Sequence, residues 1–338
     1  MQQWVVAIGV LLFSLKLIAY YLTQSVAVLT DALESTVNVM AGFIGLYSLY
    51  IAAKPRDEDH PYGHGKAEFL SAAVEGALVF MAGLIIIYEA IMAFIHPNPI
   101  QKLDKGIILI GITALVNFIV GYISVYKGKK NQSMALIASG KHLMSDTYST
   151  TGIIVGLLLI RYTGLVWLDG AVSLLFAGII LYTGYRILRS SIAGIMDEAD
   201  MDLLNRMVHS LNANRRTNWI DLHNLRVIKY GGLLHVDCHL TVPWYLNVNE
   251  AHEEIDALTS LIRHEFGESV EFFVHSDGCL DFSCAICQKE DCPVRKHPFT
   301  ERIEWTLHNI VQNKKHRLGS GAGSGTISDT ASDTKMPL

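Results

Sequence analysis

Acidic and amide side chains lie inside a long apolar stretch near the N-terminus. Four polar residues recur there at i, i+3, i+4 and i+7 and so share one helical face: Asp31, Glu34, Ser35 and Asn38. Carboxylates within a membrane helix are costly unless they face a cavity or bind a cation. We therefore expect this face to line a cation site.

A second apolar stretch carries an imidazole and a carboxylate. His142 and Asp146 are i, i+4 neighbours, so both side chains can converge on one point. Nitrogen and oxygen ligands from two facing helices suit tetrahedral Zn²⁺ and are acceptable to iron or manganese. The alternative is a buried hydrogen-bond network that only holds helices together. Two converging polar faces, one with a histidine, favour the metal site. Because these ligands must lose protons to bind a cation, metal and protons would compete there.

A polar segment between the second and third apolar stretches has metal-ligand spacing. Asp57, His60 and His64 read D-x-x-H-x-x-x-H. Composition alone would favour a solvated charged loop with incidental histidines.

Four cysteines are concentrated near the C-terminal end. Cys279, Cys284, Cys287 and Cys292 have a central C-x-x-C, which predicts one tetrahedral metal site. Structural Zn²⁺ is the first interpretation and an iron–sulfur cluster the second, because compact cysteine runs also hold clusters. The remaining thiol, Cys238, is expected in the protein core.

Six apolar stretches must position the first two groups: 4–23, 25–53, 70–95, 106–126, 134–160 and 166–188. Each approaches the roughly 20 residues needed to cross a bilayer. Eight Lys or Arg lie in loops on the side of the termini and three on the other, which places both termini in the cytoplasm. Neutralisation within the bundle or snorkelling is expected for Lys16, Glu75 and Glu89, which receive no transport role.

The C-terminal part has a different pattern. Residues 198–276 read helix, strand, strand, helix, strand, with a Gly231-Gly232 hairpin turn. This order predicts a small two-layer α+β sandwich. Apolar residues at helical spacing predict a further helix over 299–313. The predicted domains are 1–190 in the membrane, 191–278 as the α+β domain, 279–316 as a Cys₄ segment with its helix, and 317–338 as a disordered tail.

The motifs resemble the cation diffusion facilitator family of divalent metal/proton antiporters. Residues 25–32 read S-V-A-V-L-T-D-A, residues 60–68 read H-P-Y-G-H-G-K-A-E, and H-x-x-x-D follows at His142 and Asp146. The likeness covers about the first 300 residues and implies a homodimeric exporter driven by inward proton flow. The transport site would lie between the second and fifth spans, and the Asp57, His60 and His64 triad would be a second, weaker site.

The resemblance also implies a soluble domain with its own metal sites. That domain would be a cytoplasmic ferredoxin-like module used for dimerisation. His239, His252, His275 and Asp277 match the ligand positions of the family's cytoplasmic zinc sites.

The second span departs from the family. Many members place two strong ligands four residues apart there, whereas Asp31 meets Ser35 and Glu34 meets Asn38. Asp31, Glu34 and Asn38 therefore compete for the role, and an oxygen-richer shell favours harder ions such as Mn²⁺ or Fe²⁺ over a zinc-only preference.

The predicted function is proton-coupled efflux of Zn²⁺ or Fe²⁺, with Mn²⁺ possible, by alternating access across a bacterial inner or plasma membrane. The alternative is a membrane-anchored metal sensor or receptor, although an anchor would not need two acidic spans. An enzyme is not expected, since no H-E-x-x-H run is present. The net charge of −5 combines two compartments, and no basic stripe indicates nucleic acid as a partner.

Overall fold

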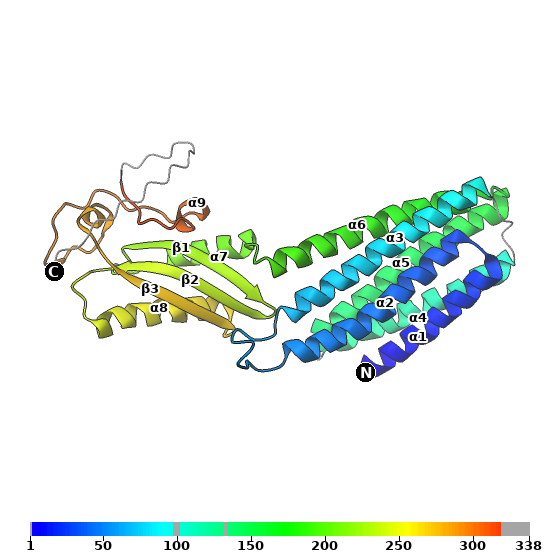
Figure 1. Ribbon diagram of the computed structural model, residues 1–338, viewed down its shortest axis with the longest axis horizontal. Coiled ribbons are helices and arrows are strands. Elements are labelled where there is room, and N and C mark those ends of the chain that lie inside the picture. The colour runs from blue at the N-terminus through cyan, green and yellow to red at the C-terminus, as the bar shows by residue number, and fades with distance from the viewer. Residues whose placement is uncertain (1, 97–101, 131–133, 319–338) are drawn as a thin grey trace. The chain divides into compact units, whose positions relative to one another are not determined.

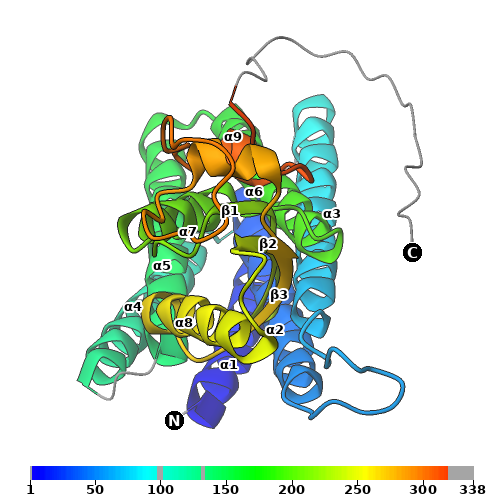
Figure 2. The same cartoon turned by 90° about the vertical axis from the view of Figure 1, so that its left-hand side faces the viewer.

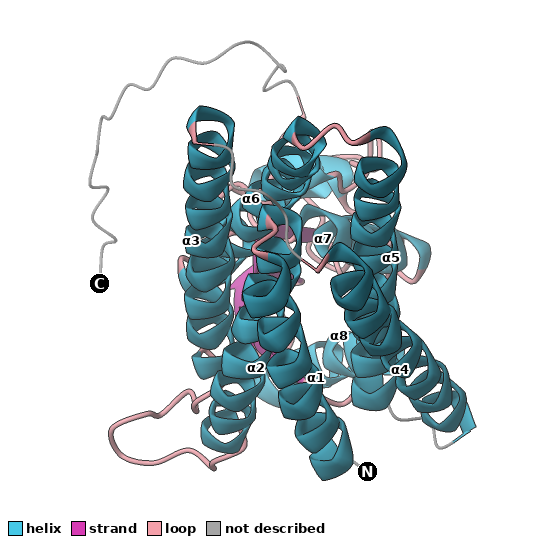
Figure 3. Cartoon of the chain, turned by 90° about the vertical axis from the view of Figure 1, so that its right-hand side faces the viewer, coloured by secondary structure: helices cyan, strands magenta, loops and turns pink. Residues whose placement is uncertain are grey.

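A computed structural model describes residues 2–96, 102–130 and 134–318, except for the side chains of 2–8, 128, 134–139, 141 and 142. The chain forms two compact units, 1–198 and 199–338. In the described residues the first unit is a helical bundle (Figures 1 and 3). Its helices are α1 Gln2–Thr23, α2 Val26–Ala52, α3 Ala67–Ile95, α4 Leu103–Lys130, α5 Met134–Thr163 and α6 Trp167–Ile195.

The bundle has apolar side chains outside and polar ones inside. Leu11, Phe43 and Leu175 are exposed, whereas Lys16 and Asp31 are almost completely buried. This inverts the pattern of a soluble protein and fits a lipid surround. Helices α2 to α6 each contain a segment long and apolar enough to span a membrane, and the described part of α1 is a shorter apolar helix. The predicted spans are therefore all helical.

Glycines set the closest helix contacts. A Cβ at Gly76 on α3 would lie 2.8 Å from the backbone nitrogen of Leu188, and one at Gly184 on α6 would lie 2.7 Å from that of Phe80. Small residues let helix backbones approach closely in membranes. The pair α3 and α6 therefore packs backbone against backbone, and Figure 3 shows these helices side by side.

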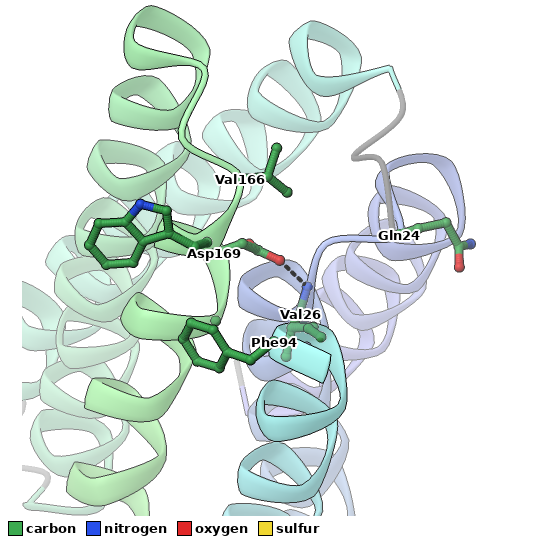
Figure 4. Close-up of a pocket in the computed structure, with 8 residues that line it drawn as sticks. Gln24, Val26, Phe94, Val166 and Asp169 are labelled. Carbon is green, nitrogen blue, oxygen red and sulfur yellow. Dashed lines mark hydrogen bonds between the residues drawn. The ribbon is translucent and has the colours of Figure 1, made fainter. Parts of the chain in front are cut away.

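The start of α2 is fixed by α6. Asp169 accepts hydrogen bonds from the Ser25 hydroxyl at 2.6 Å and from the Val26 amide at 2.7 Å. These are backbone and side-chain donors at a helix N-terminus, where a carboxylate is favoured. Figure 4 shows this contact in a small pocket lined also by Gln24 and Phe94. Asp169 thus holds the helix that carries Asp31, Glu34 and Asn38.

The second unit contains the predicted α+β order (Figures 1 and 2). Its elements are α7 Met201–Ala213, β1 Asp221–Tyr230, β2 Leu233–Val242, α8 Val248–Phe266 and β3 Val270–Gly278. The sheet order is β1-β2-β3, with β1 antiparallel and β3 parallel to β2. The core joins both helices to one sheet face, which includes Cys238 as expected.

The β1–β2 ladder contains a bulge. The register runs from Tyr230 opposite Leu233 to Arg226 opposite Asp237, and then shifts so that His223 faces His239. Asn224, with φ 54°, lies at the register shift. Asn, Asp and Gly adopt this left-handed backbone conformation more readily than other residues. The Asn224 amide donates to Gln312 O at 2.9 Å instead of to β2.

The helix predicted over 299–313 is wrong in extent. In this segment the structure has only α9, Leu307–Ile310, preceded by a 3₁₀ turn at Asp281–Ile286. The Asn212 side chain bonds both Trp305 O, at 2.6 Å, and Trp305 N, at 3.1 Å. Those backbone groups are therefore unavailable to a helical ladder. The predicted tail lies outside the described residues from 319 onward.

Replacing Gly184 with Val should destabilise the bundle. The added side chain would push α6 away from α3, with an expected cost of about 1–3 kcal/mol. The measurement is the thermal unfolding midpoint of purified protein in detergent. Gly178→Val, on the same helix with no atom within 4 Å of its Cβ position, is the control. Equal effects of the two variants would contradict close packing at Gly184.

Candidate metal centres

The first candidate centre lies between α2 and α5. The Asn38 amide nitrogen donates to Asp146 Oδ2 at 3.1 Å. Both residues line a cavity of about 270 Å³ together with Glu34, Ser145 and Ser149. Glu75 of α3 also lines this cavity, although no transport role was expected for it from the sequence. His142 belongs to α5, but its side chain lies outside the described residues.

Asp31 has a different environment from the other polar residues of α2. Lys16 Nζ of α1 lies 2.8 Å from Asp31 Oδ1, and the Thr150 hydroxyl donates to the same oxygen at 2.8 Å. Lys16 also donates to Ser35 Oγ at 2.8 Å. The expected neutralisation of Lys16 is confirmed. Asp31 is thus held in an ion pair, whereas Glu34 and Asn38 face the cavity.

The second candidate centre is the loop between α2 and α3. His60 Nδ1 lies 2.9 Å from Asp57 Oδ1, and His64 Nε2 lies 3.4 Å from Asp57 Oδ2. The hydrogen bond from the His60 side chain lowers the pKa of Asp57. The three ligand atoms lie within 4.8 Å of one another, as a metal site requires. The predicted triad therefore converges.

The third candidate centre lies on the sheet face opposite the apolar core. One cross-strand row contains three histidines, His223 of β1, His239 of β2 and His275 of β3. In the next row on this face, Asp221 and Asp277 lie on either side of Thr241. His239 Nδ1 lies 3.4 Å and His223 Nε2 3.6 Å from Asp277 Oδ2. His223, His239 and Asp277 offer ligand atoms within 4.8 Å of one another, so we call them the sheet cluster.

Of the other predicted ligands, one lies beside the sheet cluster and one does not join it. His275 Nε2 lies 3.7 Å from Asp277 Oδ1, with its ring centroid 4.7 Å from that of His239. His252 on α8 is 69% exposed and lies 3.7 Å from Asp256. His252 and Asp277 line the same surface groove.

The sheet cluster suits a divalent cation chemically. Burial lowers the pKa of His223, although Asp221 and Asp277 oppose this effect. A neutral imidazole keeps the lone pair that a metal needs. His223 Nδ1 lies 3.6 Å from Asp221 Oδ2, so Nε2, which lies 3.6 Å from Asp277 Oδ2, is the nitrogen placed to serve as a ligand. The residues present therefore fit a metal ion bound through two imidazoles and one carboxylate.

Comparison with known proteins gives the family. Residues 4–196 match the cation efflux transmembrane domain, and 200–279 match the cytoplasmic domain of cation efflux proteins. The chain belongs to the cation diffusion facilitator family. It is therefore an integral membrane transporter that exports divalent cations, and not an enzyme.

Individual relatives agree with this assignment. The chain is 35% identical over 260 residues to an uncharacterized transporter of Synechocystis sp., covering 76% of this chain and 84% of that protein. It is 26% identical over 273 residues, 80% and 91% of the two chains, to the cation-efflux pump FieF of Shewanella oneidensis. A cadmium, cobalt and zinc/H(+)-K(+) antiporter of Bacillus velezensis is 27% identical over 257 residues, 75% and 80% of the two chains.

Sequence reasoning missed one member of this transporter's sheet cluster, His223. A regular hairpin register from the Gly231-Gly232 turn would place Asn224, not His223, opposite His239. The bulge instead places His223 opposite His239, and no local sequence pattern predicts a bulge at this position. Asp221 and His316 were missed as well. Burial alone would raise the pKa of Asp221, but hydrogen bonds from His316 lower it overall.

The predicted Cys₄ site is not assembled in this cation diffusion facilitator. Among the described residues, no cysteine belongs to a group of three or more ligand atoms within 4.8 Å of one another. All five thiols are free, so no disulfide links them. Burial raises the pKa of Cys279, and Cys284, Cys287 and Cys292 add to this effect. The four thiols therefore share a region without forming a ligand shell. Cys279 is the last residue of the family match, and Cys284, Cys287 and Cys292 lie beyond it.

Replacing Lys16 with Met should strongly destabilise the transporter. Asp31 would become an unpaired buried carboxylate, at a cost of about 3–5 kcal/mol. Adding Asp31→Asn to that variant should recover much of the loss. Thermal unfolding in detergent measures both effects, with Lys105→Met at an exposed position of α4 as the control. A Lys16→Met protein as stable as the wild type would contradict the structural role of the pair.

Proposed function

We propose that the transporter exchanges a cytoplasmic divalent transition metal for protons at a site made by Glu34, Asn38, His142 and Asp146. The observation that carries this proposal is the Asn38–Asp146 contact between α2 and α5, in a cavity that Glu34 also lines. Glu34 and Asn38 are four residues apart on α2, as His142 and Asp146 are on α5. Lys16 holds Asp31, so we leave Asp31 out of the transport site.

The donor set indicates which ions suit this site. Two carboxylates, an amide oxygen and one imidazole form a shell richer in oxygen than a zinc site of histidines alone. Such a shell accepts Fe²⁺ and Mn²⁺ as well as Zn²⁺. To ligate through Oδ1, Asn38 must turn its amide nitrogen away from Asp146. We therefore expect Zn²⁺ or Fe²⁺ as the principal cargo, with Mn²⁺ as a further substrate.

Proton coupling follows from the same donors. Glu34, Asp146 and His142 must be deprotonated to bind a cation, so protons and metal compete for one site. A site exposed alternately to the two sides of the membrane then exchanges one for the other. Proton uptake from outside displaces the ion, and the protonated site returns inward.

The remaining centres are assigned to the cytoplasmic side. The positive charge of the loops favours cytoplasmic termini in a bacterial plasma membrane. Asp57, His60 and His64 would then receive the ion first. A divalent ion on the sheet cluster would regulate a homodimer formed through the cytoplasmic domains. A sensor without transport is less well supported, because α2 and α5 bring polar groups together in a membrane cavity.

Uptake into reconstituted vesicles tests the transport proposal. Zn²⁺, Fe²⁺, Mn²⁺ and Co²⁺ are supplied outside, with or without an acidic interior. Asp146→Ala should reduce uptake to the background of empty vesicles, because it removes a ligand, while thermal unfolding stays near that of the wild type. Asp104→Ala removes a carboxylate that pairs with Arg161 on the exposed surface, and should transport normally.

Two results would count against this proposal. Full transport by a folded Asp146→Ala protein would remove the site assignment. Uptake that ignores the pH gradient in the wild type would remove proton coupling while leaving the metal site in place.

We also propose that Zn²⁺ gathers Cys279, Cys284, Cys287 and Cys292 into a structural site. Their spacing and shared region support this, and an iron–sulfur cluster is the alternative. Cys287→Ser should lose about one tightly bound zinc ion per chain in elemental analysis. Cys238→Ser, which removes a core thiol, should retain it. Labile sulfide with visible absorption would favour the cluster, and equal zinc in both variants would exclude the Cys₄ site.

A further inference from the structure

The chain returns to the sheet cluster after leaving the family's cytoplasmic domain. We call residues 312–317 the strap; they lie beyond the family match, which ends at 279. Gln312 O accepts from the Asn224 amide at 2.9 Å, and the His316 amide donates to Asp221 Oδ2 at 2.9 Å. The strap therefore lies along β1 on the face that carries His223. This explains why Asp221 and His223 are buried although they point away from the apolar core.

The strap places an ammonium group at the carboxylate of the cluster. Lys315 Nζ donates to Gly278 O at 2.9 Å and lies 3.6 Å from Asp277 Oδ1. Both side chains are 20% exposed, so water screens the pair only partly. The backbone contacts of Gln312 and His316 on either side fix where the lysine can reach. Lys315 is thus positioned by the fold.

Asp277 is the shared partner of His223, His239, His275 and Lys315. Its Oδ2 faces His223 and His239 at 3.6 and 3.4 Å, and its Oδ1 faces Lys315. A divalent cation bound by the two imidazoles would take up the same carboxylate. Two cations on one partly buried carboxylate repel each other strongly at such short range. Ammonium and metal ion are therefore expected to exclude each other.

We propose that Lys315 is an internal competitor for divalent cations at the sheet cluster. Its ammonium compensates Asp277 when the cluster is empty, and a transition metal ion must displace it to bind. Displacement frees one end of the strap, so that occupation of the cluster changes the segment that follows the cysteines. This inference rests on the proposed binding of a divalent ion at the cluster. The lysine lowers the affinity, so the cluster fills only when the ion is abundant.

Zn²⁺ titration of the full-length protein in detergent tests this proposal. A chelating dye competes for the ion, and each protein is compared with its own His239→Ala counterpart to isolate the cluster. Lys315→Gln should bind Zn²⁺ at the cluster about fivefold more tightly than the wild type, as expected for removal of one partly exposed ion pair. Lys315→Arg keeps the charge and should resemble the wild type.

The neighbouring lysine supplies a matched control. Lys314 is exposed, and Lys314→Gln removes the same charge one residue away, so it should leave the affinity unchanged. Hydrogen exchange gives a second measurement that does not depend on affinity. Zn²⁺ should speed exchange at the His316 amide in the wild type, and His239→Ala should abolish that response.

The contrary outcomes are distinct. Equal affinity of Lys315→Gln and wild type, or equal tightening by Lys314→Gln, would overturn the competitor role while leaving the cluster as a metal site. Weaker binding by Lys315→Gln would show that the lysine supports the site. Identical titrations of wild type and His239→Ala would overturn metal binding at the cluster itself, and the inference with it.

Discussion

A charge inside an apolar bundle has to be compensated, and the pairing of Lys16 with Asp31 decides how the other polar groups of the membrane unit are used. The pair takes one carboxylate of α2 out of the cavity and links α1 to α2. Asp169 compensates the amides at the start of α2 and fixes that helix against α6. Glu34, Asn38 and Asp146 then face the cavity between α2 and α5. The structural role of Asp31 and the transport role proposed for Glu34 and Asn38 thus depend on different partners, although these three residues share one helical face of α2.

Charged groups that are buried in the soluble unit must be compensated too, and there the partners come from the strap. Apolar side chains of α7, α8 and the strands fill one face of the sheet, so the alternation of the strands turns His239 and Asp277 to the other face, and the bulge in β1 turns His223 there as well. A bare sheet would leave these groups in water. The strap covers Asp221 and His223 and gives both carboxylates a partner within the chain, His316 for Asp221 and Lys315 for Asp277.

Local sequence patterns predicted most of the fold and part of the candidate site. Hydropathy located the spans, helical spacing grouped Glu34 with Asn38, and ligand spacing within one loop grouped Asp57 with His60 and His64. Contacts between distant segments were beyond such patterns. Lys16 has no spacing relation to Asp31, and the choice of His223 over Asn224 depends on a bulge at which the Asn224 amide donates a hydrogen bond to Gln312 O. The prediction of a helix over 299–313 was wrong for a similar reason, because the side chain of the distant Asn212 forms hydrogen bonds with the backbone of Trp305.

Burial decides what the two Lys–Asp pairs can do. Lys16 and Asp31 are 2% and 1% exposed and share a 2.8 Å contact, so separating them leaves both charges without solvent. Lys315 and Asp277 are each 20% exposed and 3.6 Å apart, so water can replace the ammonium's partner when it moves away. The first pair is consequently a fixed element of the bundle, while the second can exchange with another cation. Gly278 O, at the end of β3, also accepts a hydrogen bond from the Lys315 ammonium. The lysine therefore keeps an acceptor nearby when it moves away from Asp277.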